Sequence, residues 1–318
     1  MKNNKAGHLA VQILLSVYRP NLVFLKEQLA SLEAQTYENI ELLIYDDCPS
    51  SRTDISIFKK NLPTLPFRVL PYAEENVGYG QAFEKLIEAS GADVLFFCDQ
   101  DDIWLPEKVE KCVGRMLEDG SLAVVCDRSI IDGEGNVITP SVRAISKSGN
   151  ETWKTGDDIA KFNLFVPYAL GMSMCVDGRF ARRSLPVSFY TAHDKWLLGC
   201  AAAEGLVSYL DEPLTCYRRH GANVSGVLKG IEGKEDYYKS RPANHLGLVR
   251  DFSARYPGFS GEKEALSFAR ARVNKNARDL FRYRYLAPEI AWFEILLKFT
   301  PSFLFRFMVY AARKIKGN

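Results

Sequence analysis

The sequence predicts an α/β fold in which a mostly parallel sheet is flanked by helices, followed by a helical C-terminal region. In the first 130 residues, short β-branched runs alternate with helical patterns, which is the rhythm of βαβ units. Acidic clusters directly follow two of the predicted strands, where open α/β sheets place their ligands. The last part of the chain is helical in pattern and rich in arginine and aromatic residues.

The predicted strands are short apolar runs bounded by turn residues. They are expected at residues 11–17, 40–45, 67–70, 94–98 and 122–126. Asn21 is expected to open the first helix, whose apolar face is Leu22, Leu25, Leu29 and Leu32. Further helices are expected at residues 78–89 and 106–117. Strand and helix signals resume at residues 168–176, 193–203 and 206–210.

Size and composition limit the classes of protein. The 318 residues are 47% hydrophobic, enough for a sizeable core, and the net charge of +2 argues against nucleic-acid binding driven by overall charge. The first residues show no charged-then-apolar signal sequence. Seven scattered cysteines without a C-x-x-C pair indicate reduced thiols. We therefore expect a cytoplasmic protein.

Two polar stretches organise the chain. Residues 139–160 are irregular in pattern and are expected to form a long loop over the site. Residues 226–239 contain three glycines and mixed charge, which indicates a boundary. The sequence thus predicts one domain at residues 1–225 and a helical region at residues 226–318.

The segment Asp99-Gln100-Asp101-Asp102 follows a predicted strand and is the first candidate site. Two carboxylates at positions i and i+2 of a strand end can converge on one hard cation, Mg²⁺ or Mn²⁺, which would bridge diphosphate oxygens. The alternative is a structural acidic turn that caps the next helix. Both readings can hold if Asp102 caps the helix while Asp99 and Asp101 bind the metal.

A series of segments gives the site a more specific interpretation. In chain order they are residues 15–20 (LSVYRP), 31–37 (SLEAQTY), 44–47 (IYDD), 76–78 (NVG) and 99–106 (DQDDIWLP). Together they resemble family 2 glycosyltransferases of the GT-A fold, and more narrowly the bacterial rhamnosyltransferase-like branch.

The resemblance implies a donor site. The nucleotide-binding residues that it implies are Ser16, Tyr18, Asp47, Asn76 and Asp99. The Asp47 carboxylate would accept the imide N–H of a pyrimidine, while Asp99 would hold the ribose or the metal and Asp101 would coordinate the metal. Without the resemblance, Asp46-Asp47 would be read as a turn, and Asp46 could orient the loop instead.

A transfer by single displacement needs a carboxylate to take the acceptor proton. In the family an acidic pair at a helix start supplies it, and the matching residues here are His193-Asp194, with Asp194 as the base. His193 replaces the usual glutamate and is placed with the residues that contact the pyrophosphate or sugar. Alternatively, the pair only caps the following helix.

The stretch Tyr217 to Ser225 resembles the family's Y-R-x-H-G-x-N segment, which replaces the Q-x-x-R-W of processive members. A cellulose- or chitin-type polymerase is therefore disfavoured. Arg218 and Arg219 would offset charge on the diphosphate, and His220 could be a neutral metal ligand. The other interpretation of the arginine pair is a solvated face.

Two further segments could line the sugar pocket. Trp104 could form a wall, since aromatic rings pack well against sugar faces, and by resemblance residues 171–174 would form the floor. For both, a purely structural place in the core remains open.

Residues 287–310 are dense in aromatic and aliphatic side chains, and cations are interspersed and follow them. Glu294, Lys298, Pro301 and Arg306 interrupt the run, which argues against a membrane-spanning helix. Two interpretations remain: short helices that lie on an anionic inner membrane surface, or helices that pack on the domain or on a second subunit.

The sequence therefore predicts an inverting, metal-dependent glycosyltransferase. The donor would be a UDP- or dTDP-sugar, with dTDP-rhamnose favoured by resemblance, and the acceptor a glycan or lipid-linked glycan of cell-surface polysaccharide synthesis. Alternatives are a UDP-hexose transferase and a catalytically silent nucleotide-sugar-binding protein. A dehydrogenase would need G-x-G-x-x-G after the first strand, and residues 16–21 contain no glycine.

Overall fold

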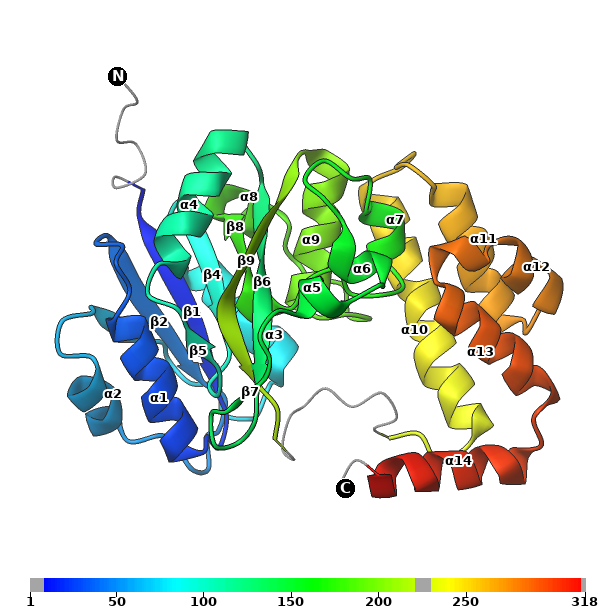
Figure 1. The fold of residues 1–318 in the computed structure, drawn as a ribbon, viewed down its shortest axis with the longest axis horizontal. Coiled ribbons are helices and arrows are strands. Elements are labelled where there is room, and N and C mark those ends of the chain that lie inside the picture. Colours follow the sequence, from blue (N-terminus) through cyan, green and yellow to red (C-terminus); the bar gives the residue numbers. More distant parts are fainter. Residues whose placement is uncertain (1–8, 221–229, 316–318) are drawn as a thin grey trace. The chain divides into compact units, whose positions relative to one another are not determined.

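The computed structural model describes residues 9–220 and 230–315 (Figure 1). It divides into two compact units, each described by itself. The first unit comprises Met1–Asp157, Tyr168–Val187 and Ala192–Arg218. The second unit comprises Asp158–Pro167, Ser188–Thr191 and Arg219–Asn318. The expected domain boundary after residue 225 falls among residues 221–229, outside the described part.

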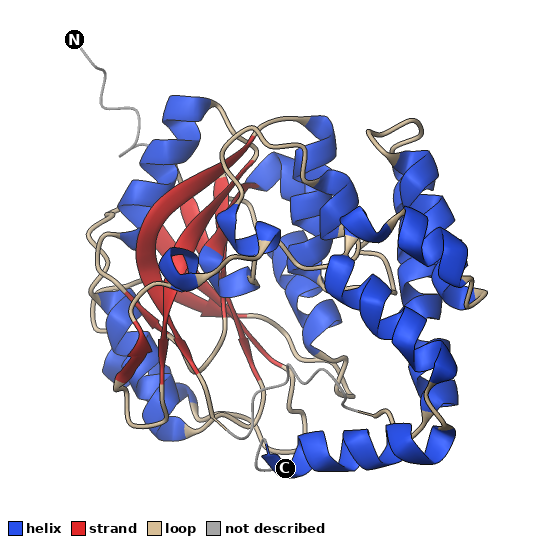
Figure 2. Cartoon of the chain, turned by 45° about the vertical axis from the view of Figure 1, so that its right-hand side comes forward, coloured by secondary structure: helices blue, strands red, loops and turns tan. Residues whose placement is uncertain are grey.

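The first unit contains one twisted sheet, drawn in red in Figure 2. Its strands are β1 (Val11–Val17), β2 (Ile40–Asp46), β3 (Phe67–Val69), β4 (Val94–Cys98), β5 (Ile103–Trp104), β6 (Ala123–Ile131), β7 (Val137–Thr139), β8 (Met174–Asp177) and β9 (Val207–Arg218). Their order is β3-β2-β1-β4-β8-β6-β9-β5, with β7 paired to β6. The strands β1 to β4 are parallel, while β8 runs antiparallel to both β4 and β6.

The predicted α/β class is confirmed, and the sheet is mixed. Among the described strands, β3, β2, β1 and β4 are parallel neighbours, and β6 and β9 are a second parallel pair, while β8, β5 and β7 each pair antiparallel. The strand β9 is longer than the run expected at residues 206–210, because it continues to Arg218. Its Pro213 is tolerated because the register with β6 shifts there, so a ladder hydrogen bond is not required.

The helices of the first unit are α1 (Leu22–Glu33), α2 (Ile55–Asn61), α3 (Tyr79–Ala89), α4 (Lys108–Asp119), α5 (Val142–Ile145), α6 (Gly149–Thr152), α8 (Gly178–Arg183) and α9 (His193–Glu204), together with the short turn η2 (Gly171–Ser173). The Asn21 side chain caps α1 by accepting from the Val23 amide at 2.9 Å, as its sequence position predicts. Gly120 ends α4 in the left-handed region, with φ of 64°.

The core of the first unit lies between the sheet and its helices. All five residues of β4 are buried, which explains why this strand reads as a continuous apolar run. Leu25, Leu29 and Leu32 of α1 belong to the same cluster. Leu22 does not, because it is 47% exposed, so the buried face of α1 is narrower than predicted.

The second unit is helical, as expected for the C-terminal region. Its elements are α7 (Ala160–Asn163), α10 (Lys234–Arg255), α11 (Glu262–Val273), α12 (Ala277–Arg282), η3 (Arg284–Leu286), α13 (Pro288–Phe299) and α14 (Ser302–Ile315). Arg272 and Glu294 form a fully buried ion pair at 2.8 Å, and the Tyr237 hydroxyl donates to the same carboxylate at 2.7 Å. These charges are stable inside the unit because each is paired and hydrogen-bonded.

Candidate active site

Polar segments follow β1, β2 and β4 and meet at one edge of the sheet, because these strands are adjacent and parallel. The Gln100 side chain joins two of them. Its oxygen accepts from the Tyr18 amide at 2.8 Å, and its nitrogen donates to the Tyr18 carbonyl at 3.1 Å. Gln100 therefore fixes the segment after β1 against the acidic turn after β4, a role that the sequence did not predict.

A cavity of about 430 Å³ opens beside these segments, within the size range of small-molecule sites. It is lined by Tyr18, Arg19, Cys48, Pro49, Ser50, Glu74, Glu75 and Asn76. Tyr18 and Asn76 were predicted to bind the nucleotide, and the others were missed because they lie in loops without a periodic pattern. Arg19 adopts a positive φ of 43°, and its hydrogen bond to Cys48 lowers the pKa of that thiol.

Asp47 holds the loop at residues 76–78. Its carboxylate accepts from the amides of Val77 and Gly78 and from the Asn76 side chain, each at 2.8 Å. The residue is only 3% exposed. Asp47 and Asn76 thus position the loop at residues 76–78 beside the cavity. Their contact with a nucleobase remains a prediction, as does that of the half-buried Ser16 in β1.

Asp46, the neighbouring residue, orients the loop after β2. Its two carboxylate oxygens accept from the amides of Cys48 at 3.0 Å and Thr53 at 2.6 Å. This arrangement is an Asx-type turn, and it places Cys48 and the residues after it along the cavity.

The acidic turn after β4 concentrates negative charge. Burial of the carboxyl group among protein atoms, together with the charges of Asp101 and Asp194, raises the pKa of Asp99 to about 7, although part of the residue remains exposed. Burial also raises the pKa of Asp102 well above its usual range. Asp102 accepts from the Arg218 amide at 3.0 Å, and its other oxygen has no hydrogen-bond partner among the described residues. It therefore does not cap α4.

Lys108 supplies a positive charge under this turn. It is fully buried, donates to the Met172 carbonyl, and stacks its ammonium on the Trp104 ring at 3.2 Å from the centroid. Its charge opposes the rise in the pKa values of Asp99 and Asp102. The sequence did not single out Lys108, since a lysine in the first turn of a helix is normally solvated.

Trp104 is part of the core. It is 2% exposed and packs on Phe96 with ring centroids 5.9 Å apart. The prediction that it walls a sugar pocket is therefore corrected: β5 pairs with β9 and turns this side chain inward, under Lys108.

Asp194 lies in the first turn of α9 and is half-buried. One carboxylate oxygen accepts from the Gly171 amide at 3.1 Å, and the other accepts from the Lys195 amide at 2.7 Å. Its charge is close enough to Asp99 to raise the pKa of that group. The structure thus brings Asp194, predicted as the base, to the same charged region as the acidic turn, and the Gly171 backbone orients it.

His193 points into the core. It is 4% exposed and stacks on Phe83 at 3.9 Å and on Phe97 at 4.7 Å between ring centroids. Within the part of the chain that the structure describes, both ring nitrogens lack a hydrogen-bond partner, and burial lowers the pKa of the imidazole to about 4. A neutral, enclosed ring cannot contact a pyrophosphate or sugar, so this prediction is corrected.

The buried His193 should make the protein sensitive to acid. Its folded pKa of about 4 lies below the ordinary value of 6.5, so its contribution to stability is complete above pH 6.5 and is lost as the pH falls toward 4. The full difference corresponds to roughly 3 kcal/mol. Urea denaturation across this range should show a smaller loss for His193→Leu than for the wild type. An equal loss in both proteins would contradict the assignment.

Arg218 is also committed to the interior. It is 1% exposed, and its guanidinium donates to the Asp101 carbonyl at 2.9 Å, to two carbonyls of the turn at residues 132–133, and to the Glu27 carboxylate. It also lies over the Phe24 ring at 4.5 Å. The prediction of a pyrophosphate contact is corrected, because these protein groups engage the guanidinium and exclude it from the surface.

Arg219 and His220 directly follow β9 and belong to the second unit. Arg219 is exposed and His220 half-buried. Their predicted contacts with diphosphate and metal remain predictions. The glycine and asparagine of the same motif, Gly221 and Asn223, lie outside the described residues.

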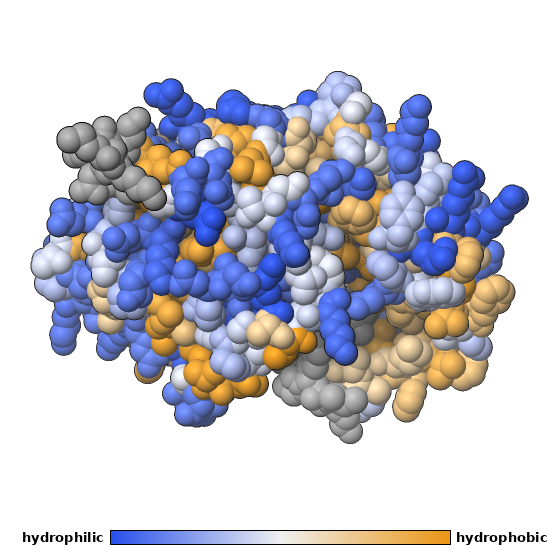
Figure 3. All heavy atoms as spheres, turned by 45° about the horizontal axis from the view of Figure 1, so that its top comes forward, coloured by the Kyte–Doolittle hydropathy of each residue, from blue (hydrophilic) through white to orange (hydrophobic). Residues whose placement is uncertain are grey.

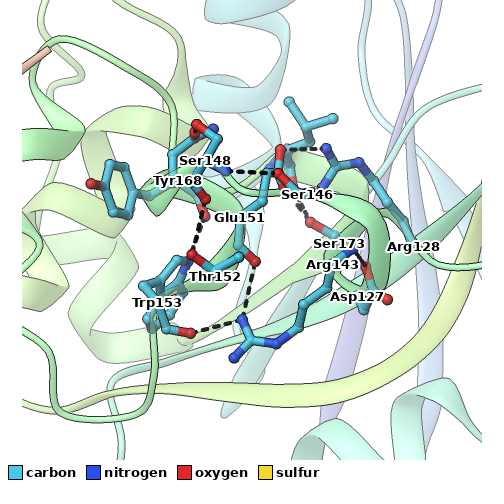
Figure 4. Close-up of polar contacts among 12 residues, drawn as sticks. Asp127, Arg128, Arg143, Ser146, Ser148, Glu151, Thr152, Trp153, Tyr168 and Ser173 are labelled. Carbon is cyan, nitrogen blue, oxygen red and sulfur yellow. Dashed lines mark hydrogen bonds and ion pairs between the residues drawn. The ribbon is translucent and has the colours of Figure 1, made fainter. Parts of the chain in front are cut away.

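The segment after β7, expected to be an irregular loop, contains the short helices α5 and α6. Figure 4 shows how they are tied to β6. Arg128 of β6 pairs with Glu151 through two hydrogen bonds of 2.7 and 2.9 Å. Arg143 donates to the carbonyls of Glu151 and Trp153, and the Trp153 indole donates to the Tyr168 carbonyl at 3.1 Å. Glu151 of α6 therefore anchors the segment to β6, and Arg143 of α5 holds α5 against the backbone of α6 and Trp153.

The residues of the acidic turn fit a divalent cation that is bound together with phosphate oxygens. Within the described residues, no three histidine, cysteine, aspartate or glutamate side chains converge as a metal site. Magnesium, however, normally takes only one or two protein carboxylates and completes its shell with phosphates and water. Asp99 and Asp101 offer such a pair. Burial and then the charge of Asp101 raise the pKa of Asp99, and a bound cation would favour its ionised form.

The mixed sheet, the acidic turn after β4 and the carboxylate at the start of α9 define an α/β enzyme of the GT-A type. The chain belongs to glycosyltransferase family 2. Residues 13–183 match the model of the family described as Glycosyl transferase family 2. The predicted family is thereby confirmed.

Two relatives extend the match beyond this range. An uncharacterized glycosyltransferase of Nostoc is 28% identical over 63% of this chain, and the match spans 62% of the relative's own length, less than two thirds. The dTDP-rhamnosyl transferase RfbG of Shigella flexneri is 30% identical over 72% of this chain and 76% of its own. Among solved structures, S. aureus TarS in complex with UDP-GlcNAc superposes with a TM-score of 0.59 at 15% identity, covering 89% of this chain and 83% of that one. This last similarity concerns the fold alone.

Proposed function

We propose that this enzyme transfers the sugar of a pyrimidine nucleoside diphosphate sugar to an acceptor hydroxyl, with inversion at the anomeric carbon. The observation that carries the proposal is the placement of Asp194 beside the acidic turn, where it raises the pKa of Asp99. One end of a donor would lie in the cavity beside Tyr18 and Asn76, and its diphosphate would lie at Asp99 and Asp101.

In this proposal Asp194 acts as the general base. The acceptor oxygen attacks the anomeric carbon, the bond from that carbon to the diphosphate oxygen breaks, and Asp194 takes the acceptor proton. The Gly171 and Lys195 amides hold the carboxylate in place while leaving lone pairs on both oxygens for the acceptor. Such a fixed orientation favours proton transfer because little reorganisation is needed during reaction.

Asp99 and Asp101 are proposed to hold Mg²⁺ or Mn²⁺. When bound, the cation would offset the negative charge that develops on the departing diphosphate. The buried ammonium of Lys108 partly offsets the negative charge of this turn. It therefore favours the ionised forms of Asp99 and Asp102.

The proposed donor is dTDP-rhamnose and the proposed acceptor a glycan or lipid-linked glycan of cell-surface polysaccharide synthesis. The similarity to RfbG, a dTDP-rhamnosyl transferase, supports the donor. TarS was captured with UDP-GlcNAc, which keeps a UDP-hexose as the second candidate. A pyrimidine base is common to both donors, so the two share the cavity assignment and differ in the sugar.

A donor screen tests this proposal. Calorimetric titration with dTDP-rhamnose, UDP-glucose and UDP-GlcNAc, with and without Mn²⁺, should give one donor whose binding depends on the cation. Asp101→Asn should weaken that binding about tenfold or more, because half of the proposed carboxylate pair is lost. The control is Asp54→Asn, which retains a capping side chain at the start of α2. Binding that is identical in the absence of a cation would refute the metal assignment.

The same screen separates an enzyme from a silent binding protein. An active transferase hydrolyses its donor slowly when no acceptor is present, so release of free nucleoside diphosphate should accompany binding. A protein that binds a donor tightly but never releases the diphosphate, even with acceptor glycans added, would favour the silent alternative.

A further inference from the structure

The helices α13 and α14 of the second unit expose a stripe of large apolar side chains. Within each helix its members recur at intervals of three or four residues, the spacing of one helical face, and they are 48% to 75% exposed. They are Trp292, Leu296, Phe299, Phe303 and Phe307. In Figure 3 hydrophobic residues gather at the lower right, the side on which Figure 1 places α12 to α14. Exposure of so many neighbouring aromatic residues indicates an interaction surface.

The opposite faces of these helices are packed. Leu297 of α13, and Phe305 and Val309 of α14, are at most 3% exposed and form a core cluster with Ile231 and Tyr237. The helices are therefore held by the second unit through one face, and the aromatic stripe lies outside this packing. Buried and exposed residues alternate at helical spacing within each helix, so the stripe stays exposed while the opposite face packs in the folded unit.

The charges along this stretch have a single sign. From residue 295 to residue 318 the sequence contains no aspartate or glutamate and five cations, which are Lys298, Arg306, Arg313, Lys314 and Lys316. Lys298 and Arg306 are exposed on α13 and α14. A helical surface that combines aromatic residues with lysine and arginine is typical of helices that lie in the interface of an anionic bilayer.

We propose that the aromatic stripe of α13 and α14 binds the surface of an anionic lipid membrane. A second copy of the chain is a poorer occupant, because a two-fold contact through this surface would place cations against cations. The binding would be peripheral, since among the described residues no helix is both long and apolar enough to cross a bilayer. The proposal is independent of the donor assignment and places the enzyme where a lipid-linked acceptor would be found.

Vesicle flotation tests this proposal with the full chain. Vesicles of phosphatidylcholine with phosphatidylglycerol should capture the protein, and vesicles of phosphatidylcholine alone should capture much less. The double variant Phe303→Ser, Phe307→Ser should bind at least about tenfold more weakly, because it loses two exposed aromatic side chains that would insert into the bilayer interface. Lys298→Gln and Arg306→Gln should each weaken binding to the anionic vesicles about fivefold, and added salt should have the same direction of effect.

Phe189→Ser is the matched control, because Phe189 is 89% exposed and lies outside the stripe. It should float like the wild type. Urea denaturation reports folding, so an unfolding transition equal to that of the wild type would exclude misfolding of the second unit in the double variant. Equal flotation of the double variant and the wild type would overturn the proposal. So would a lipid-free dimer, measured by light scattering, that Phe303→Ser, Phe307→Ser converts to a monomer.

Discussion

Asp194→Asn is expected to lower the turnover number by about 10²- to 10⁴-fold, the usual contribution of a positioned general base. The amide is nearly isosteric with the carboxylate but cannot take the acceptor proton. It can still accept from the Lys195 or the Gly171 amide through its remaining oxygen, so the fold should be kept. Initial rates with saturating donor and acceptor measure the loss.

Donor affinity separates a catalytic defect from a binding defect in this variant. We expect donor affinity to change less than about threefold, since Asp194 is not proposed to contact the diphosphate. Glu204→Gln, at the other end of α9, is the matched control and should retain wild-type rates. Full activity of Asp194→Asn would remove this residue from the mechanism, while loss of donor binding would move it to the donor site.

Arg218→Met is expected to lower the free energy of unfolding by about 3 kcal/mol, a large effect for one substitution. The methionine fills part of the volume but donates no hydrogen bonds. The carbonyl of Asp101 and those of the turn at residues 132–133 would then be left without this donor. Because buried acceptors without partners are costly, the loss should come mainly from them and less from the half-exposed Glu27.

The exposed neighbour Arg219 provides the control. Arg219→Met should change the unfolding free energy by less than about 0.5 kcal/mol, as is usual for surface positions. Urea denaturation of both variants measures the difference. Since the Arg218 guanidinium also holds the backbone at Asp101, weaker donor binding should accompany its loss. Equal stability of the two variants would show that the guanidinium network is dispensable.

Local patterns were sufficient for much of the first unit. The bounds of β1 and β4 agree with prediction because both strands are mainly apolar and almost entirely buried, and polar residues follow them. The Asn21 cap and the terminal glycine of α4 likewise act within one or two turns of the chain. The direction of β8 could not be predicted, because it depends on pairing with two strands that are distant in sequence.

Prediction of the site was less complete, and the errors share one cause. Arg218, His193 and Trp104 were assigned to ligands by residue type, yet all three are at most 4% exposed. Whether an arginine or a histidine faces a ligand or the interior depends on which carbonyls and rings surround it in the folded chain. Lys108 was overlooked for the same reason, since only tertiary packing buries it beneath the acidic turn.

The acidic turn after β4, the position of Asp194 at the start of α9 and the membership in family 2 could be predicted from the sequence, because they depend on the order of residues along the chain. Which charged groups act on one another became evident only from the tertiary structure. The proximity of Asp194 to Asp99 and the support of the turn by Lys108 join segments that are far apart in sequence. Electrostatic interaction depends on distance and burial, and neither is defined until the strands are paired and the helices packed.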